Sequence, residues 1–256
     1  MRMIQLQHLV RPLLVAASLV AAWEAAVWLS ATPHYILPPP SLVAQEFADR
    51  GDLLATHALW TVVEILAGLV LGVAIGAASA LAMARFVGLR AWGVPLMVIS
   101  QAVPVFAIAP LLVLWLGYGL ASKIAMASLV IFFPVASAFY DGLRRIEPGW
   151  LDLARLMDAP PFAVLLQIRL PAALPAFASG VRVAAAVAPI GAIIGEWVGA
   201  SAGLGYLMMQ QLARGQTALA FAALVVLAVI GVALYLLVDA GLRRLMPWVP
   251  ASPDLA

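Results

Sequence analysis

Long stretches without charge divide the 256-residue chain. Residues 65–84, 91–122, 124–140 and 215–238 contain no Asp, Glu, Lys or Arg. A membrane-spanning helix needs about 20 mostly apolar residues, and these stretches are near that length or longer. Two more apolar stretches contain internal charges, namely Glu24 in the first and Arg182 and Glu196 in the second. We therefore predict an all-α integral membrane protein of one domain, 1–256, with six spans. Their expected bounds are about 12–30, 60–83, 93–115, 123–140, 172–198 and 217–239.

The composition excludes most soluble classes of protein. Hydrophobic residues make up 65% of the chain and charged residues 10%, against roughly a quarter charged in soluble domains. One globule of this size cannot bury so much apolar surface, so a soluble enzyme is disfavoured. The chain has no cysteine and three histidines, which gives little basis for a metal site. We expect no metal and no cofactor in this chain.

The basic residues predict the direction of the spans. If the N-terminus is cytoplasmic, ten arginines lie inside and three basic residues outside, which is a positive-inside bias. The inside residues are Arg2, Arg11, Arg85, Arg90, Arg144, Arg145, Arg155, Arg169, Arg243 and Arg244, and the outside residues are Arg50, Lys123 and Arg214. Both termini are then cytoplasmic. No basic stripe lies on a soluble face, so we expect no nucleic-acid partner.

The first apolar stretch has two interpretations. It follows MRMIQLQH and resembles a signal peptide that is cleaved off. However, it continues through WEAAVWLS and is long for such a peptide. We favour a retained first helix.

Small residues recur at a spacing of four in two of the predicted spans. Such a row forms a flat strip that lets helices approach closely in lipid. The rows are Gly68, Gly72 and Gly76 in the second span, and Gly191, Gly195 and Gly199 in the fifth. Packing inside the chain is the favoured interpretation, and a dimer seam or a sliding surface is the alternative.

Prolines and isolated polar residues mark candidates for a substrate path. Pro104 and Pro110 interrupt the third span, which predicts either a cavity-lining helix or a static kink. Ser100 and Gln101 precede this break and line the path or bond to another helix. Glu196 and Trp197 near the outer end of the fifth span could offer an acceptor and a stacking face to a flat heterocycle. The alternative for Glu196 is a buried carboxylate bonded to backbone or holding the gate.

Other charged residues suggest structural roles. We expect Glu64 to face the interface or pair with a partner chain, and Arg182 to pair with an acid or to extend toward the inner surface. Ser41 is a plausible N-cap for a short helix on the outer surface.

The cytoplasmic loop 141–171 reads DGLRRIEPGWLDLARLMDAPPFAVLLQIRLP. Trp150, Leu153, Leu156 and Met157 recur at helical spacing, and Pro161 suits the first turn of a second helix. We predict a short helix–turn–helix with an apolar face. It either seals the bundle as a lid or presents a surface to a partner.

This loop resembles the EAA loop of ABC importer permeases. The family pattern is Glu-Ala-Ala, three residues, Gly, nine residues, Ile, one residue and Leu-Pro. Ile168, Leu170 and Pro171 match in register, while Asp152-Leu153-Ala154 takes the place of Glu-Ala-Ala and Asp158 that of the glycine. The glycine allows a left-handed turn, which Asp tolerates better than most residues. Three further stretches carry the resemblance: ILPPPSLV, SQAVPVFAIAPLLVLWLGYGLASK and GEWVGASAGLGYL.

The resemblance implies a type I ABC importer permease in a bacterial inner membrane. Such permeases work in pairs, here as a homodimer, with two ATPase subunits and a solute-binding protein. The chain has no Walker A motif, so ATP and Mg are expected on the partner ATPase, and this chain is not an enzyme. The residues expected to couple it to the ATPase are Asp152, Leu153, Ala154, Met157, Asp158, Ala159 and Phe162.

The branch resembled handles alkanesulfonates, taurine, nitrate, thiamine-pyrimidine precursors and riboflavin. The stretches 100–123 and 195–207 are most similar to those of hydroxymethylpyrimidine permeases. Two other classes of function, a secondary transporter and an intramembrane enzyme, fit the sequence less well. A secondary transporter would usually show internal repeats, and an intramembrane enzyme would need a catalytic pair, for which neither HExxH nor GxSxG is present.

Overall fold

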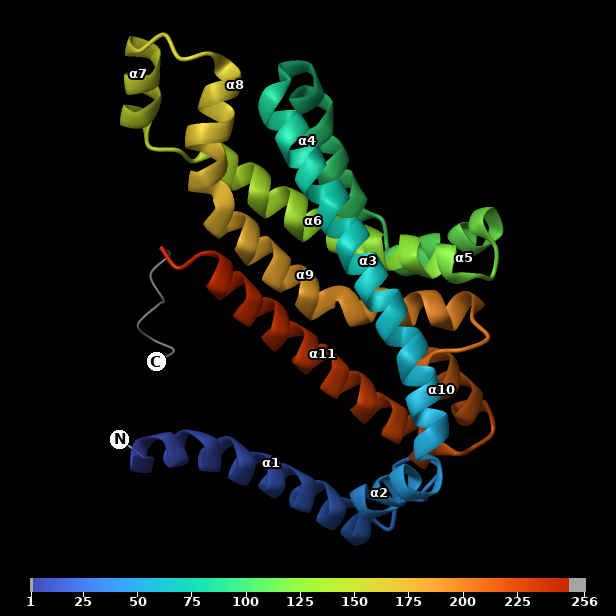
Figure 1. Ribbon diagram of the computed structural model, residues 1–256. Coiled ribbons are helices and arrows are strands. Elements are labelled where there is room, and N and C mark those ends of the chain that lie inside the picture. Colours follow the sequence, from blue (N-terminus) through green and yellow to red (C-terminus); the bar gives the residue numbers. More distant parts are fainter. Residues whose placement is uncertain (1, 249–256) are drawn as a thin grey trace.

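The computed structural model describes residues 2–248, without the side chains of residues 2–13 and of Gln101. All regular elements in this part of the chain are helices (Figure 1). They are α1 (Arg2–Ser30), α2 (Pro40–Asp49), α3 (Gly51–Arg85), α4 (Val87–Ala102), α5 (Val105–Leu116), α6 (Leu120–Arg144), α7 (Pro148–Leu156), α8 (Pro161–Ala163), the π-helical turn η1 (Val164–Arg169), α9 (Leu170–Gly199), α10 (Leu204–Ala213) and α11 (Thr217–Leu245).

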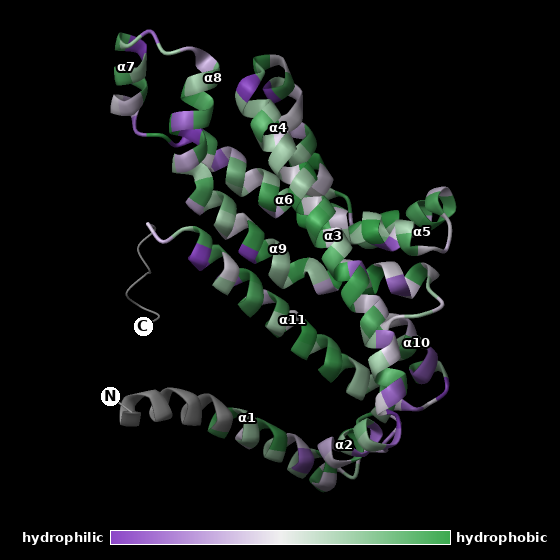
Figure 2. Cartoon of the chain, viewed as in Figure 1, coloured by the Kyte–Doolittle hydropathy of each residue, from purple (hydrophilic) through white to green (hydrophobic). Residues whose placement is uncertain are grey.

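Four helices of the described chain are long and apolar enough to cross a membrane: α3, α6, the continuous run Pro161–Gly199 and α11. The bent pair α4 and α5 adds a fifth if it forms one span. The N-terminal helix contributes a shorter apolar segment, Leu14–Ser30. Figure 2 shows hydrophobic residues along these helices and hydrophilic ones concentrated at the loops and ends. The sixth span and the sides of the two termini stay predictions.

The third predicted span, 93–115, is not one straight helix. Its two halves, α4 and α5, meet at an angle of 103°. The break falls at Pro104, because a proline disfavours the helical region for the residue before it and Val103 is extended, with φ −80° and ψ 123°. Pro95 and Pro110 lie inside α4 and α5 without ending them. The structure thus shows a sharp break here, and the lining of a cavity by this span stays a prediction.

The loop before the fifth span also differs from the prediction. The second helix of the loop is not separate, since α8, η1 and α9 follow one another without interruption from Pro161 to Gly199. Only residues 157–160 separate α7 from this run. Pro161 occupies the first turn, as predicted. The predicted fifth span is therefore the outer part of a 39-residue helix, Pro161–Gly199, whose inner end is the second half of the loop.

The central helix of the bundle is α6, which lies between α3 and α9. Gly68 of α3 and Gly191 of α9 both face Ala127, which is fully buried between them. A Cβ atom added at Gly191 would lie 2.8 Å from the Cα of Ala127, and one at Gly72 would lie 2.7 Å from Cγ2 of Ile131. The strips of small residues thus pack within the chain.

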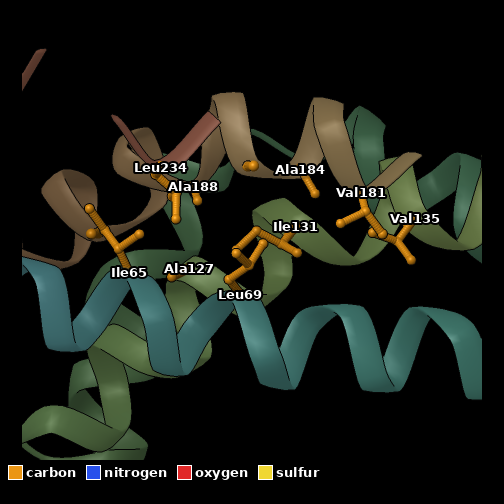
Figure 3. Close-up of a cluster of buried hydrophobic side chains, with 11 residues drawn as sticks. Ile65, Leu69, Ala127, Ile131, Val135, Val181, Ala184, Ala188 and Leu234 are labelled. Atoms are coloured by element: carbon orange, nitrogen blue, oxygen red, sulfur yellow. The ribbon is translucent and has the colours of Figure 1, made fainter. Parts of the chain in front are cut away.

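Aliphatic side chains of the same three helices complete this contact. Figure 3 shows Ile65 and Leu69 from α3 directed at Ile131 and at Ala188. All four are buried. Contacts of this kind hold helices together in lipid, where the hydrophobic effect between helices is weak.

Adding a side chain on the strip should separate α3 from α6. We expect Gly72→Leu to lower the free energy of unfolding by about 1–3 kcal/mol, the usual cost of overpacking a close contact. Thermal unfolding of the detergent-purified protein measures this loss. Gly241→Leu in α11 is the matched control, because a Cβ there meets nothing within 4 Å. Equal melting temperatures for the two variants would contradict the close packing.

Candidate functional site

The helix α7 turns an apolar face away from the rest of the chain. Its exposed side chains Trp150, Leu153, Leu156 and Met157 have 58% to 84% of their surface accessible. Pro148 occupies the first turn, where a proline is favourable. Four large apolar side chains are thus exposed within residues 148–157. This exposure indicates a surface that a partner covers.

The turn after α7 has the geometry of a Schellman motif. Asp158 has a φ of 48°, in the left-handed region. The N–H of Asp158 donates to the carbonyl of Arg155 at 3.1 Å, and the N–H of Ala159 donates to that of Ala154 at 2.9 Å. This is the pair of bonds that defines the motif, in which glycine is usual at the left-handed position. Asp158 thus adopts the left-handed conformation that the glycine of the family pattern allows.

The seven predicted coupling residues lie on α7, on the turn after it and on α8, but they are not all exposed. Asp152, Leu153, Met157, Asp158 and Phe162 are exposed, and Ala159 is half-buried. Ala154 differs from the expected apolar anchor, because it is 5% exposed and faces the chain itself. Asp152 forms an ion pair with Arg155, whose Nη1 is 2.6 Å from Oδ1.

A cleft of about 260 Å³ lies beneath α7 and joins it to the inner ends of the bundle helices. It is lined by Ala84, Arg85, Leu151, Ala154, Arg155, Ala159, Pro161, Val164, Leu165 and Arg169. Sequence reasoning did not find this cleft, since its residues come from three separate segments. The helix α7 thus touches the bundle at one side and is exposed on the other.

A second polar arrangement lies at the opposite, outer end of α9. The hydroxyl of Thr61 donates to Oε1 of Glu196 at 2.6 Å, and the N–H groups of Gly205 and Tyr206 donate to Oε2. The N–H of Leu204 donates to the Thr61 oxygen at 2.8 Å. His57 accepts from the N–H of Gly203 at 3.0 Å through Nδ1. We call the bonded set Thr61, Glu196 and residues 203–206 the outer clasp.

The clasp explains why glycine occupies position 203. The φ of Gly203 is 113°, which other residues rarely adopt, and a Cβ atom there would collide with the Glu196 carboxyl group. Glu196 is 1% exposed and is fully engaged by the chain. The interpretation of Glu196 as a buried carboxylate bonded to backbone is therefore confirmed, and in this conformation it has no surface left for a ligand.

Glu64 and Lys123 form a buried pair beside the clasp. Nζ of Lys123 is 3.9 Å from Oε1 of Glu64, and the two side chains are 6% and 1% exposed. Glu64 was expected at an interface or against a partner chain, and this is wrong because it pairs within the chain with Lys123. Lys123 was counted among the basic residues outside and as the first residue of the fourth span, and it lies in the first turns of α6, which begins at Leu120. The signal for this pairing was the isolation of both charges in apolar sequence, where ionisable groups usually find each other.

Two further polar contacts involve Arg182 and Ser41. Arg182 pairs with Asp239 at 2.6 Å, as expected of an arginine inside a span. Ser41 is not the N-cap of α2, since Pro39 holds that position. The backbone N–H and hydroxyl of Ser41 donate instead to Glu24, at 3.0 and 2.8 Å, which joins α2 to α1.

The remaining substrate-path candidates lie near the α4–α5 break and on α9. Pro104 is exposed at the break, and the hydroxyl of Ser100 donates to the carbonyl of Met97 at 2.7 Å within its own helix. The Gln101 side chain lies outside the described part of the chain. Trp197 is 42% exposed and keeps a free face. Within the described residues, no group of three His, Asp or Glu could hold a metal ion.

The comparisons with known proteins decide the family. The model for "Binding-protein-dependent transport system inner membrane component" matches residues 54–249. This chain belongs to that family. It is a permease subunit of an ABC importer, a multi-pass inner-membrane component without catalytic activity of its own, and it works with a separate ATPase and a binding protein.

Relatives in sequence match along nearly the whole chain. A "Probable ABC transporter permease protein" of Haemophilus influenzae is 52% identical over 93% of this chain and 97% of its own length. The "Formylaminopyrimidine transport permease protein ThiX" of Halalkalibacterium halodurans is 33% identical, over 93% and 95%. The "Riboflavin transport system permease protein RibX" of Chloroflexus aurantiacus is 38% identical, over 90% and 87%. Permeases named for aliphatic sulfonates and taurine match at 28% to 30% identity.

A solved structure supports the fold. A chain of the MetNI methionine ABC transporter in an inward-facing conformation has a TM-score of 0.63 and 20% identity, and the match covers 73% of this chain and 93% of that one. The type I permease fold is thereby confirmed.

Removing the clasp carboxylate should destabilise the outer end of the bundle. We expect Glu196→Leu to lower the free energy of unfolding by about 2 kcal/mol or more, since the N–H of Gly205 and the hydroxyl of Thr61 lose their acceptor in a buried place. Glu196→Gln, which keeps one acceptor oxygen, should lose less. Thermal unfolding in detergent measures both, with the exposed Gln167→Leu as control. Identical melting of Glu196→Leu and the control would contradict the role of the clasp.

Proposed function

We propose that this permease imports a small nitrogen heterocycle related to a hydroxymethylpyrimidine. The support is the ranking of relatives by identity: those named for a formylaminopyrimidine and for riboflavin are 33% and 38% identical, above those named for sulfonates and taurine. Riboflavin is the second candidate: its relative is more identical, at 38%, but the match covers a smaller share of both chains, 90% and 87% against 93% and 95%. A binding protein delivers the solute, and the exposed ring of Trp197 is a candidate for contacting a flat heterocycle on its path.

We further propose that two copies of this chain form the pathway, with two ATPase subunits beneath them. ATP and Mg are bound by the ATPases. The apolar side chains of α7 lie in a groove of the ATPase, and Asp152 and Asp158 face its polar or basic groups. The exposure of Leu153, Met157 and Phe162 carries this assignment, since in the free chain they are 58%, 72% and 59% accessible.

Movement of α7 has a direct route to the bundle. The Schellman turn ties α7 to Pro161, where the continuous run to Gly199 begins. That run packs along α6 and ends at the outer clasp. When the ATPases close on ATP, the two α7 helices approach each other and the two bundles rotate, so that the cavity between the two permease copies opens to the outside. After hydrolysis this cavity reopens to the inside.

Reversing the polarity of α7 should uncouple transport. For Asp152→Arg combined with Leu153→Asp, we expect at least a tenfold loss of ATPase association and of uptake, because a charge replaces an apolar contact and a basic residue replaces an acidic one. Co-purification of the ATPase and uptake by membrane vesicles measure the effect. Membrane insertion and melting temperature should not change, since both side chains are exposed.

The control for this experiment is Asp141→Arg, which reverses a half-exposed acid at the inner end of α6, away from α7. It should bind the ATPase and transport as the unaltered permease does. Full coupling in the α7 double variant would contradict the assigned role of this helix and favour a lid that only packs on the bundle.

Substrate choice is tested in proteoliposomes that contain the permease, its ATPase and its binding protein. We expect ATP-dependent uptake of a radiolabelled hydroxymethylpyrimidine, with at most a tenth of that rate for taurine. Uptake of riboflavin alone would select the second candidate. Preferred uptake of taurine or a sulfonate would contradict the heterocycle class, and uptake without ATP would contradict the ATP-driven mechanism.

A further inference from the structure

The cleft beneath α7 gathers three arginines from three segments. Arg85 ends α3, Arg155 lies on α7 and Arg169 ends η1. The other lining residues are Ala, Leu, Pro and Val, so the cleft contains positive charge and apolar surface but no acidic side chain. Such a combination suits a ligand with an anionic head and an apolar remainder.

Two of these arginines are not neutralised by an acid. Arg155 is paired with Asp152, on the exposed side of α7. For Arg85 and Arg169, no carboxylate of the chain from residue 14 to 248, where side chains are described, lies within 4.0 Å. Guanidinium groups bind phosphate oxygens through two parallel hydrogen bonds. An anion of this type between them would offset the repulsion of like charges.

The position of the cleft favours the phosphate of a membrane lipid. Beside Arg85, the corner between α3 and α4 exposes Phe86, Val87 and Trp92, with 53%, 82% and 77% of their surfaces accessible. Tryptophan is typical of the membrane–water boundary, and basic residues on the cytoplasmic side attract anionic lipids. The volume of about 260 Å³ is below the range of pockets for drug-sized ligands, which favours a headgroup over a nucleotide.

We propose that this cleft binds the phosphate of an anionic lipid from the cytoplasmic leaflet. Arg85 and Arg169 bind the phosphate oxygens, and Arg155 contributes from α7. The acyl chains extend along the exposed apolar residues of the α3–α4 corner. One phosphate then links α3, η1 and α7 and stabilises the position of α7. The importance of that position rests on the proposed coupling function, whereas the lipid site itself does not.

Native mass spectrometry of the detergent-purified permease tests the site. Phosphatidylglycerol is titrated against phosphatidylcholine, which has the same phosphate but no net charge. We expect phosphatidylglycerol to bind more tightly, and the double variant Arg85→Gln with Arg169→Gln to weaken its binding on the order of tenfold or more. Arg90→Gln with Arg244→Gln, which removes two exposed inner arginines outside the cleft, should change binding less than twofold.

A charge-preserving variant covers the case in which the glutamine variant does not fold. Arg85→Lys with Arg169→Lys should retain much of the binding, because lysine keeps the charge but not the paired bonds. Unchanged phosphatidylglycerol binding in the glutamine variant would overturn the proposal, and so would equal binding of the two lipids. Displacement of phosphatidylglycerol by millimolar inorganic phosphate would overturn the lipid as the source and leave a free-phosphate site.

The same preparations separate this proposal from the proposed function. ATPase association is measured in parallel for each variant. Retained ATPase association in the variant Asp152→Arg with Leu153→Asp, together with intact phosphatidylglycerol binding in the unaltered permease, would count against the coupling role of α7 alone. Loss of lipid binding with normal ATPase association and uptake would confirm the site and show that it does not set the position of α7.

Discussion

The whole architecture depends on how closely α6 approaches its two neighbours. Ala127 fits between Gly68 and Gly191, so the backbones of three long helices meet across one small side chain. In lipid, apolar side chains gain nothing by leaving the bilayer for one another, so association must come from dense contact and from satisfied polar groups. The stack of α3, α6 and α9 supplies the first of these along most of the thickness of the bundle.

Satisfied polar groups are the second contribution to helix association. Near the outer end, Glu196 accepts bonds from the segment 203–206 and from Thr61, while Glu64 and Lys123 pair alongside. A lone charge at this depth would be costly, and the chain places each one beside a partner drawn from another helix. These contacts link the outer ends of α3, α6 and α9, the same helices that the glycines bring together. Toward the inner side, Arg182 of α9 pairs with Asp239 of α11, and α7 contacts the rest of the chain through its turn and the lining of the cleft.

The helices of the bundle, the glycine strips and the turn at Asp158 could be predicted from the sequence, because each depends on local spacing or on the conformational preference of a single residue. The match of Ile168, Leu170 and Pro171 to the loop pattern likewise led to the family. What could not be predicted depends on residues far apart in the chain. The isolation of Lys123 and Glu64 in apolar sequence indicates that each has a partner but not which one. The sequence likewise does not show that the loop after α9 folds back so that the N–H of Gly205 bonds to Glu196. The course of the chain at Pro104 was open, because a proline in a span is compatible with a cavity-lining helix as well as with a static kink.

The hydrogen bonds that close the turn after α7 all lie within residues 153–159. The shape of this turn is therefore determined by these consecutive residues and does not depend on a neighbouring subunit. For the proposed contact with the ATPase, a turn closed by its own hydrogen bonds needs little reordering, so little conformational entropy is lost on assembly.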